Sequence, residues 1–326
     1  MQTSIPSQMK AAAIDRFGGP EALGVKTVPV PRLGPGEVLI RVEAAGIGSW
    51  DPAECEGEMQ ELKPGGVTFP YVPGTDGAGT VVAVGEGVSS HKAGDKVYAF
   101  GFLNDKGGFY AEYAVVKAED VAPVPKGLSA EQAGALAADG ITALQGVQDA
   151  LGVRQGTTLL VYGASGGVGH LAVQLARRLG ARVVAVASGQ DGVDLVKRLG
   201  AEKVVDGRGD AQAVVGAIRD FAPEGLDAAL VLAGGDTTNK ALEAVKQGGH
   251  IAFPNGVEPE PARRDGVKMT SYNGESNAEV LARLNKLIEA GPFHVEVSQV
   301  YRLDEARRAL EAVGRHHLGK LALRIH

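Results

Sequence analysis

The sequence predicts an α/β protein in which a doubly wound parallel sheet follows a mainly antiparallel β-domain. Its 326 residues are more than one ordinary core accommodates, so we expect two domains. The first third contains short, β-branched runs bounded by Gly, Pro or Asp, a pattern typical of a small antiparallel barrel. These runs are residues 37–43, 79–84, 95–100 and 111–117.

After Pro125 the pattern changes to helices that alternate with apolar strands. Residues 129–148 are rich in alanine and predict a helix, with Ser129 and Gln132 spaced for a capping box. Near-continuous apolar strands separated by helices indicate a parallel sheet covered on both faces. These strands are expected at residues 158–162, 182–187, 203–205, 227–232 and 250–253. From about Pro261 we expect helices at residues 277–290 and 304–313 and a last strand at 320–325.

Composition and charge argue against several kinds of partner. The 33 basic and 39 acidic residues are mixed along the chain and give a net charge of −6, so no segment is prepared for nucleic acid or anionic lipid. The first ten residues are polar, and nowhere do about 18 apolar residues follow one another. We therefore expect a cytoplasmic protein. Cys55 is the only cysteine, which excludes an intramolecular disulfide and a zinc site of several thiolates.

One glycine-rich segment points to chemistry. The expected strand ending at Tyr162 runs into the sequence GASGGVG, and a helix of period 3.6 follows. Strand, glycines, helix and second strand come in the order of a Rossmann dinucleotide-binding unit of ~30 residues, which favours that interpretation over an ordinary strand-to-helix turn. We expect Ala164 to replace the first glycine at the tight turn, Gly166 to admit the pyrophosphate and Gly169 to let the helix pack on the strand. The loop residues predicted to bind the cofactor are Ala164, Ser165, Gly166, Gly167 and Val168.

The end of the second strand favours NADP over NAD. An NAD enzyme places an acid there to hold the ribose 2′-hydroxyl, whereas this strand ends at Ala187. Ser188 and Gln190 follow and can donate hydrogen bonds to a 2′-phosphate. The alternative is that Asp191 or Asp194, both beyond the strand, binds the ribose instead.

Several motifs in order resemble the medium-chain dehydrogenase/reductase family, and within it the zinc-independent quinone oxidoreductases related to zeta-crystallin. The resemblance spans almost the whole chain and implies a GroES-like barrel completed by the C-terminal segment, with the Rossmann domain inserted. It implies domain boundaries at 1–126, 127–259 and 260–326. The motifs are residues 11–20, 35–42, 73–79, 94–97, 140–143, 163–169 and 319–320.

The resemblance also implies that no metal takes part. In the zinc-dependent members a Cys and a His hold the catalytic metal at the positions of Gly48 and Thr75, and neither residue is a metal ligand of that kind. The structural zinc loop of four cysteines is missing as well, and we expect no metal role for the seven histidines. Without a Lewis acid, the expected acceptor is a small molecule that is already electrophilic, such as a quinone or an activated alkene, which takes a hydride from NADPH.

The acceptor site is less defined by the resemblance. Quinone reductases of this family often carry Asn and Tyr at the positions of Gly48 and Ala53, and both are absent. Trp50 is expected either to stack on a flat acceptor or to be structural, and Asp51 either to be catalytic or to cap a helix beginning at Pro52. The candidate catalytic residues are Ser49, Trp50, Asp51 and Asp139.

Further cofactor contacts follow from the resemblance alone. It implies that Thr142 contacts the nicotinamide side and that Lys320 reaches the cofactor from the last strand, the alternative for Lys320 being a solvated lysine. The residues expected by the ribose and the carboxamide are Leu232, Ala233, Gly234, Phe253, Pro254 and Asn255. Relatives commonly pair Rossmann sheets edge to edge, so we expect a homodimer, with residues 250–253 as the candidate edge strand.

The leading functional hypothesis is an NADPH-dependent quinone or enone reductase that works without zinc. Two alternatives remain: an alkenal or enoyl-thioester reductase on the same scaffold, and a catalytically inactive NADP-binding protein.

Overall fold

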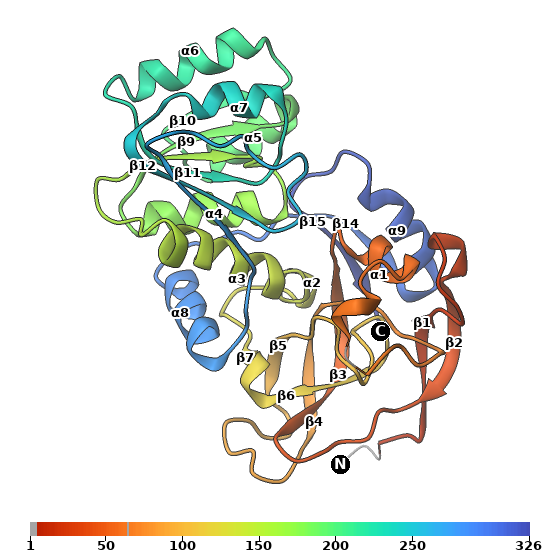
Figure 1. Cartoon of the computed structure of the whole chain (residues 1–326). Coiled ribbons are helices and arrows are strands. Elements are labelled where there is room, and N and C mark those ends of the chain that lie inside the picture. Colours follow the sequence, from red (N-terminus) through yellow and green to blue (C-terminus); the bar gives the residue numbers. More distant parts are fainter. Residues whose placement is uncertain (1–4, 64) are drawn as a thin grey trace. The chain divides into compact units, whose positions relative to one another are not determined.

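The computed structural model describes residues 5–63 and 65–326, which form two compact units. The first, called the β-unit, comprises Met1–Ala138, Ser276–Asn285 and Val297–His326. The second, called the α/β-unit, comprises Asp139–Glu275 and Lys286–Glu296. The elements of both are labelled in Figure 1.

The β-unit is built on a mainly antiparallel sheet of seven strands in the order β14-β15-β3-β4-β5-β7, with β6 paired to β3. Only β14 and β15 run parallel, and the four strands expected from the first third of the sequence all occur. A separate antiparallel pair, β1 and β2, was not expected. The bounds are β1 Gln8–Ala13, β2 Gly24–Pro29, β3 Glu37–Ile47, β4 Asp76–Val84, β5 Lys96–Phe100, β6 Tyr113–Lys117, β7 Val121–Pro123, β14 Val297–Arg302 and β15 Lys320–Arg324.

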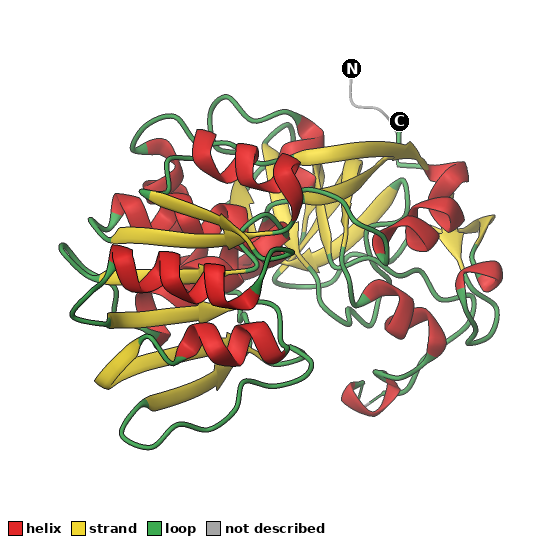
Figure 2. Cartoon of the chain, turned by 90° about the horizontal axis from the view of Figure 1, so that it is seen from above, coloured by secondary structure: helices red, strands yellow, loops and turns green. Residues whose placement is uncertain are grey.

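The α/β-unit is a parallel sheet of six strands in the order β10-β9-β8-β11-β12-β13. The chain adds strands on one side of β8, then returns and adds them on the other, which is the doubly wound order of a Rossmann sheet. Helices lie on both faces of these strands (Figure 2). The bounds are β8 Thr158–Tyr162, α4 Gly167–Arg178, β9 Arg182–Ala187, α5 Gly189–Arg198, β10 Lys203–Asp206, α6 Ala211–Phe221, β11 Leu226–Val231, α7 Asp236–Leu242, β12 Val245–Pro254 and β13 Lys268–Tyr272.

The remaining helices lie before and after this sheet in the chain. The Ser129 capping box is confirmed, because the Gln132 N–H donates to Ser129 Oγ (3.2 Å) and the Ser129 N–H to Gln132 Oε1 (3.0 Å). The prediction of one helix at 129–148 is wrong, because this segment is divided into α2, α3 and a π-helical turn. The Tyr272 hydroxyl donates to the Thr142 carbonyl (3.0 Å) just before the π-helical turn begins. The bounds are α1 Asp51–Glu56, α2 Ala130–Gly134, α3 Ala137–Leu144, the π-helical turn Gln145–Ala150, α8 Ala278–Glu289 and α9 Ala306–Val313.

Strand β13 changes two expectations. The run at 250–253 is not an edge strand, because β12 lies between β11 and β13. Residues 260–275 were expected in the returning segment, yet they belong to the α/β-unit with β13. No apolar pattern predicts β13, because an edge strand has fewer buried positions and none of its five residues is fully buried.

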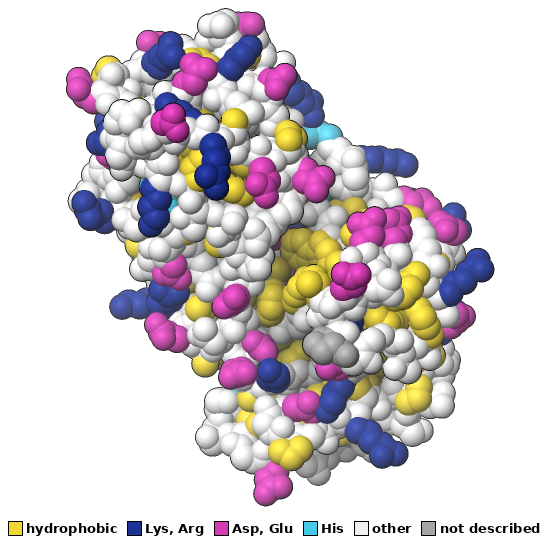
Figure 3. Space-filling model, viewed as in Figure 1, with side chains coloured by type: hydrophobic (Ala, Val, Ile, Leu, Met, Phe, Trp, Pro, Cys, Tyr) yellow, Lys and Arg dark blue, Asp and Glu magenta, His cyan; other side chains and the backbone are white. Residues whose placement is uncertain are grey.

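The surface agrees with the mixed charge pattern of the sequence. On the face drawn in Figure 3, basic and acidic side chains are interspersed. Among the residues that the structure describes, no helix has the length and apolar character needed to span a bilayer.

The close packing of α4 on β8 gives a stability prediction. A Cβ on Gly169 would lie 2.2 Å from the Gly163 carbonyl oxygen and 2.7 Å from Ala164 Cα, so we expect Gly169→Ala to lower the free energy of unfolding by about 1–3 kcal/mol. Gly216→Ala in α6 is the matched control. It is exposed and has open space, so we expect a gain of about 0.5–1 kcal/mol. Urea unfolding measures both changes, and equal stability of the two variants would contradict the packing argument.

Candidate active site

The glycine loop lies between β8 and α4, where the chain turns left-handed at Gly163 (φ 87°). The N–H groups of Gly163 and Ala164 both donate to the Val186 carbonyl, at 3.0 and 2.8 Å, which ties the loop to β9. The sequence placed the tight turn at Ala164. Instead Gly163 takes the left-handed conformation, which leaves Ala164 free to carry a side chain.

The glycine positions of the loop differ in how much space a side chain would find. A Cβ on Gly169 would strike the loop backbone, and one on Gly167 would lie 2.2 Å from Asp139 Oδ2. At Gly166 the nearest atom would be 3.6 Å away, so the protein itself would tolerate a side chain there. Gly166 is the N-cap of α4 and, being a glycine, makes no side-chain cap bond of its own. A bare backbone at the start of a helix is the geometry that fits a pyrophosphate.

Predicted cofactor residues meet at the carboxyl edge of the six-stranded sheet. The glycine loop follows β8, and Leu232, Ala233 and Gly234 follow the neighbouring strand β11. A Cβ on Gly163 would be 3.2 Å from Leu232 Cβ, so the two loops are in contact. Phe253 and Pro254 end β12, and the N–H of Asn255 donates to the Tyr272 carbonyl (2.8 Å). The strand order reverses between β8 and β11, which is where nucleotides bind in open parallel sheets.

Two further predicted residues come from α3. Asp139 is 5% exposed and lies against Gly167, so the structure brings it to the glycine loop. The carbonyl of Thr142 accepts the Tyr272 hydroxyl, and its side chain lies against Gly274. Ser49, Trp50 and Asp51 are residues of the β-unit.

A basic residue that the sequence analysis missed lies beside the turn after β9. Arg208 follows β10, the neighbour of β9, and its Nε donates to Ser188 Oγ (2.9 Å). Ser188 in turn donates its N–H to Ser165 Oγ (3.1 Å) in the glycine loop. Gln190 is exposed on α5 and donates to Asp194. A cation three residues beyond the predicted strand 203–205 was the available signal, but only the strand order puts it beside Ser188.

A carboxylate also borders this turn. Asp206 Oδ1 accepts the N–H groups of Gly189 (2.9 Å) and Arg208 (3.0 Å), and these bonds lower the pKa of Asp206. Asp191, one of the two alternative ribose ligands, accepts the N–H of Gly192 (2.9 Å).

In the β-unit, Trp50 occupies the space that the resemblance assigns to metal ligands. A Cβ on Gly48 would lie 2.4 Å from Trp50 Cε2, and Trp50 Nε1 donates to Thr75 Oγ1 (2.9 Å). Lys320 lies over the indole, with Nζ 5.2 Å from the ring centroid, and pairs with the buried carboxylate of Asp76. The alternative that Lys320 is a solvated lysine is wrong, because it is 3% exposed. In residues 5–63 and 65–326 no cluster of three or more His, Cys, Asp or Glu could hold a metal ion.

Asp51 is fully buried and does not cap α1 as its alternative role required. The N-cap is Trp50 without a side-chain bond, whereas Asp51 Oδ2 accepts the Gly48 N–H (2.8 Å) and the Tyr110 hydroxyl. Ser49, beside it, is exposed.

Asp51 forms a buried acid pair with Glu54, one helical turn further along α1. The Tyr71 hydroxyl donates to Glu54 Oε1, but Asp51 Oδ1 and Glu54 Oε2 are buried without a hydrogen-bond partner among the described residues. Burial and then the neighbouring Glu54 raise the pKa of Asp51 to about 8, and burial also raises the pKa of Glu54. The pair therefore retains a proton near neutral pH. Burial raises the pKa of the adjacent Cys55 thiol too, which makes it a poor nucleophile.

Comparison with known proteins decides the family. Residues 34–126 match the alcohol dehydrogenase GroES-like domain, and residues 167–269 match the zinc-binding dehydrogenase domain. Pig (Sus scrofa) quinone oxidoreductase is 31% identical over 97% of both chains. The chain belongs to the medium-chain dehydrogenase/reductase family, with quinone oxidoreductases among its relatives. The second match lies wholly outside Gly48 and Thr75, so it carries no information about zinc at those positions.

Other relatives show the range of this family. The NADPH-dependent alkenal/one oxidoreductase of Arabidopsis thaliana is 33% identical over 88% of this chain and 71% of its own. Among solved structures, an NAD-dependent alcohol dehydrogenase has a TM-score of 0.86 at 30% identity, covering 98% of this chain and all of the other. Mycobacterial Rv1454c in complex with NADPH has a TM-score of 0.81 at 29% identity, covering 97% of this chain and all of the other. This chain is thus an oxidoreductase of a nicotinamide-dinucleotide-dependent family.

The acid pair gives a pH prediction. Between pH 4 and 8 the folded protein holds a proton on Asp51 that the unfolded chain releases, so this group's contribution to stability falls as pH rises through that window. Asp51→Asn keeps an acceptor for Gly48 and Tyr110 and directs an amide toward Glu54. We expect it to change stability little at pH 4 and to increase it by roughly 2–5 kcal/mol at pH 9.

Chemical denaturation across this pH range measures the effect. Glu56→Gln, an exposed carboxyl on the same helix, is the control and should follow the wild-type profile. An Asp51→Asn profile parallel to wild type would mean that Asp51 is ionised throughout.

Proposed function

We propose that this chain transfers a hydride from NADPH to a quinone or an activated alkene without a metal. The observation that carries the proposal is the Trp50 indole, which fills the space beside Gly48 and binds Thr75, the two positions at which zinc enzymes of the family hold their metal. A side chain that could ligate zinc has no room at Gly48 unless Trp50 moves. An alkoxide would thus have no Lewis acid to stabilise it, and the acceptor must already be electrophilic.

The residues of the α/β-unit fit a dinucleotide. The backbone at Gly166 and Gly167 and the start of α4 would hold the pyrophosphate, and Ser188, Gln190 and Arg208 would bind the adenosine ribose and its 2′-phosphate. Thr142, Lys320, residues 232–234 and residues 253–255 remain the proposed contacts of the ribose and nicotinamide. Bound NADPH supplies the hydride, and the protein aligns the acceptor and excludes water.

For the acceptor we retain Trp50, whose partly exposed indole offers a flat apolar surface, and the exposed Ser49. Asp51 has no exposed surface, so we assign it to the buried acid pair rather than to the acceptor. Asp139 lies against the glycine loop, and we assign it to the cofactor side. Reduction of alkenals or enoyl thioesters is the second candidate. The Arabidopsis relative is named as an alkenal/one oxidoreductase, and Gly48 and Ala53 replace the Asn and Tyr common in quinone reductases.

An acceptor panel tests the reaction. We expect protein treated with a chelator until metal-free to oxidise NADPH with a quinone or an α,β-unsaturated ketone, and to reduce neither saturated ketones nor aldehydes at a comparable rate. Turnover restricted to enoyl thioesters would favour that alternative. Stoichiometric zinc with loss of activity on chelation, or tight NADPH binding without any turnover, would contradict the proposal.

Cofactor preference is tested at Arg208. A charge-assisted hydrogen bond to the 2′-phosphate is worth about 1.5–3 kcal/mol, so NADPH should bind at least tenfold more tightly than NADH. Arg208→Ala should remove that difference while leaving NADH binding unchanged. Ala187→Asp should reverse the order by repelling the phosphate and accepting the ribose hydroxyls.

Calorimetric dissociation constants for both cofactors measure the preference, with Arg219→Ala on α6 as the control for charge. Equal affinities of wild type for NADPH and NADH would show that Asp206 or Asp191 binds the ribose and that the preference is wrong.

We also propose a homodimer, now through β13, the outermost strand of the described six-stranded sheet on that side. Pairing two copies of β13 would satisfy its outer backbone groups. Light scattering should give twice the chain mass of 33.6 kDa at micromolar concentration, and the mass of one chain would contradict the dimer. Cytoplasmic location stays a prediction.

A further inference from the structure

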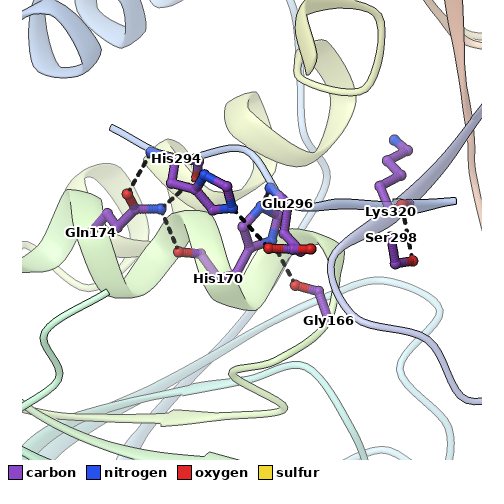
Figure 4. Close-up of polar contacts among 7 residues, drawn as sticks. All are labelled: Gly166, His170, Gln174, His294, Glu296, Ser298 and Lys320. Carbon is purple, nitrogen blue, oxygen red and sulfur yellow. Dashed lines mark hydrogen bonds and ion pairs between the residues drawn. The ribbon is translucent and has the colours of Figure 1, made fainter. Parts of the chain in front are cut away.

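His170 has both ring nitrogens engaged inside the α/β-unit (Figure 4). It lies on the first turn of α4 and is 1% exposed. Nδ1 is 2.9 Å from the Gly166 carbonyl oxygen, and Nε2 is 3.0 Å from the Glu296 backbone nitrogen. A carbonyl only accepts and a backbone N–H only donates, so the proton lies on Nδ1 and Nε2 is the acceptor. The ring is therefore neutral and held in one tautomer, in agreement with burial that lowers the pKa of His170 to about 4.

The bond to Gly166 acts on the peptide unit that begins α4. The Gly166 carbonyl accepts twice, from the backbone N–H of His170 (3.1 Å) and from its ring. In a planar trans peptide the carbonyl and the following N–H point in opposite directions. With its oxygen turned toward His170, this peptide directs the Gly167 N–H away from the imidazole, at the end of the helix where an anion binds.

This peptide joins two glycines, which makes its orientation easy to change. Glycine adopts many backbone conformations, and no neighbouring side chain or backbone atom within 3.5 Å would restrict a Cβ at Gly166. The steric freedom is at Gly166, because a Cβ on Gly167 would lie 2.2 Å from Asp139 Oδ2. We propose that His170 is a positioning residue for the dinucleotide, which aims the Gly167 N–H at the pyrophosphate by holding the Gly166 carbonyl. The inference rests on the proposed cofactor site and adds a residue that need not touch the cofactor.

The segment that His170 Nε2 contacts is also held by another residue of α4, which makes a control variant possible. The segment 294–296 is bound to α4 by Gln174 as well, because Gln174 accepts the His294 N–H and donates to the His294 carbonyl, both at 2.9 Å. On the same segment, His294 Nε2 lies 2.7 Å from Glu296 Oε2. Anchoring of this segment can therefore be weakened at Gln174 without removing the bond from His170 to Gly166.

The two ring contacts are separated by two conservative variants. The side-chain nitrogen of Asn replaces Nδ1, so His170→Asn retains a donor to Gly166 and loses the bond to Glu296. The terminal amide of Gln reaches the place of Nε2, so His170→Gln retains an acceptor for Glu296 and loses the donor to Gly166. Gln174→Ala is the third variant. It removes the two bonds to His294 and the bond from Gln174 Nε2 to the His170 carbonyl (2.9 Å), and it leaves both contacts of the His170 ring in place.

We measure dissociation constants for NADPH, NADH and 2′-AMP, and the Tm of each cofactor-free variant. All three variants should lower Tm, but only His170→Gln should weaken NADPH and NADH, by the same factor of roughly three to ten. His170→Asn and Gln174→Ala should bind both within twofold of wild type. 2′-AMP lacks the pyrophosphate and should bind His170→Gln as it binds wild type.

The outcomes distinguish this inference from the proposed function. If the wild type binds NADPH and NADH and His170→Gln binds both with the same affinity, the positioning role is wrong and the proposed function is unaffected. The same follows if His170→Asn is weakened as much as His170→Gln, or if 2′-AMP is weakened in parallel. Wild-type protein that binds neither dinucleotide overturns the proposed function and this inference with it.

Discussion

The close approach of α4 to β8 is the constraint on which the candidate cofactor site depends. At Gly169 the helix comes so near the loop backbone that a Cβ would lie 2.2 Å from the Gly163 carbonyl oxygen. This contact brings the start of α4 to the carboxyl edge of the sheet, where the loops that follow β8 and β11 are in contact. The left-handed turn at Gly163 and its bond to Val186 hold the loop in the same place from the other side. The site is thus defined by backbone packing before any side chain takes part.

Side chains then refine that backbone site from two ends. Arg208 and Ser188 border the turn after β9, where we propose that charge selects between NADPH and NADH. His170 acts from behind the loop, where it can affect any dinucleotide but carries no charge of its own. An affinity change for NADPH alone therefore points to the first group, and an equal change for both cofactors points to the second.

In the β-unit, the indole of Trp50 packs beside the two positions at which zinc enzymes of the family hold their metal. It covers Gly48, binds Thr75 and receives the ammonium of Lys320 over its face. Lys320 is neutralised by Asp76, whereas the nearby acids Asp51 and Glu54 retain a proton because burial disfavours two charges. The family match to a zinc-binding dehydrogenase domain and the absence of ligands at Gly48 and Thr75 are compatible, because the match concerns the nucleotide-binding segment.

The sequence by itself determined the features encoded by neighbouring residues: the alternation of apolar strands with helices, the glycine loop with Gly169 and the capping box at Ser129. The sequence also showed that Ala187 stands where an NAD enzyme has an acid, because this position is identified from neighbouring residues of the same strand. Only the tertiary structure decided which distant residues meet. Arg208 lies beside Ser188 because β10 pairs with β9. Strand β13, rather than residues 250–253, forms the edge of the sheet, and it could not be predicted because a polar edge strand has no apolar run. His170 meets Glu296, 126 residues away, and Asp51 is buried with Tyr110, since sheet order and long-range packing, which local periodicity does not encode, set these contacts.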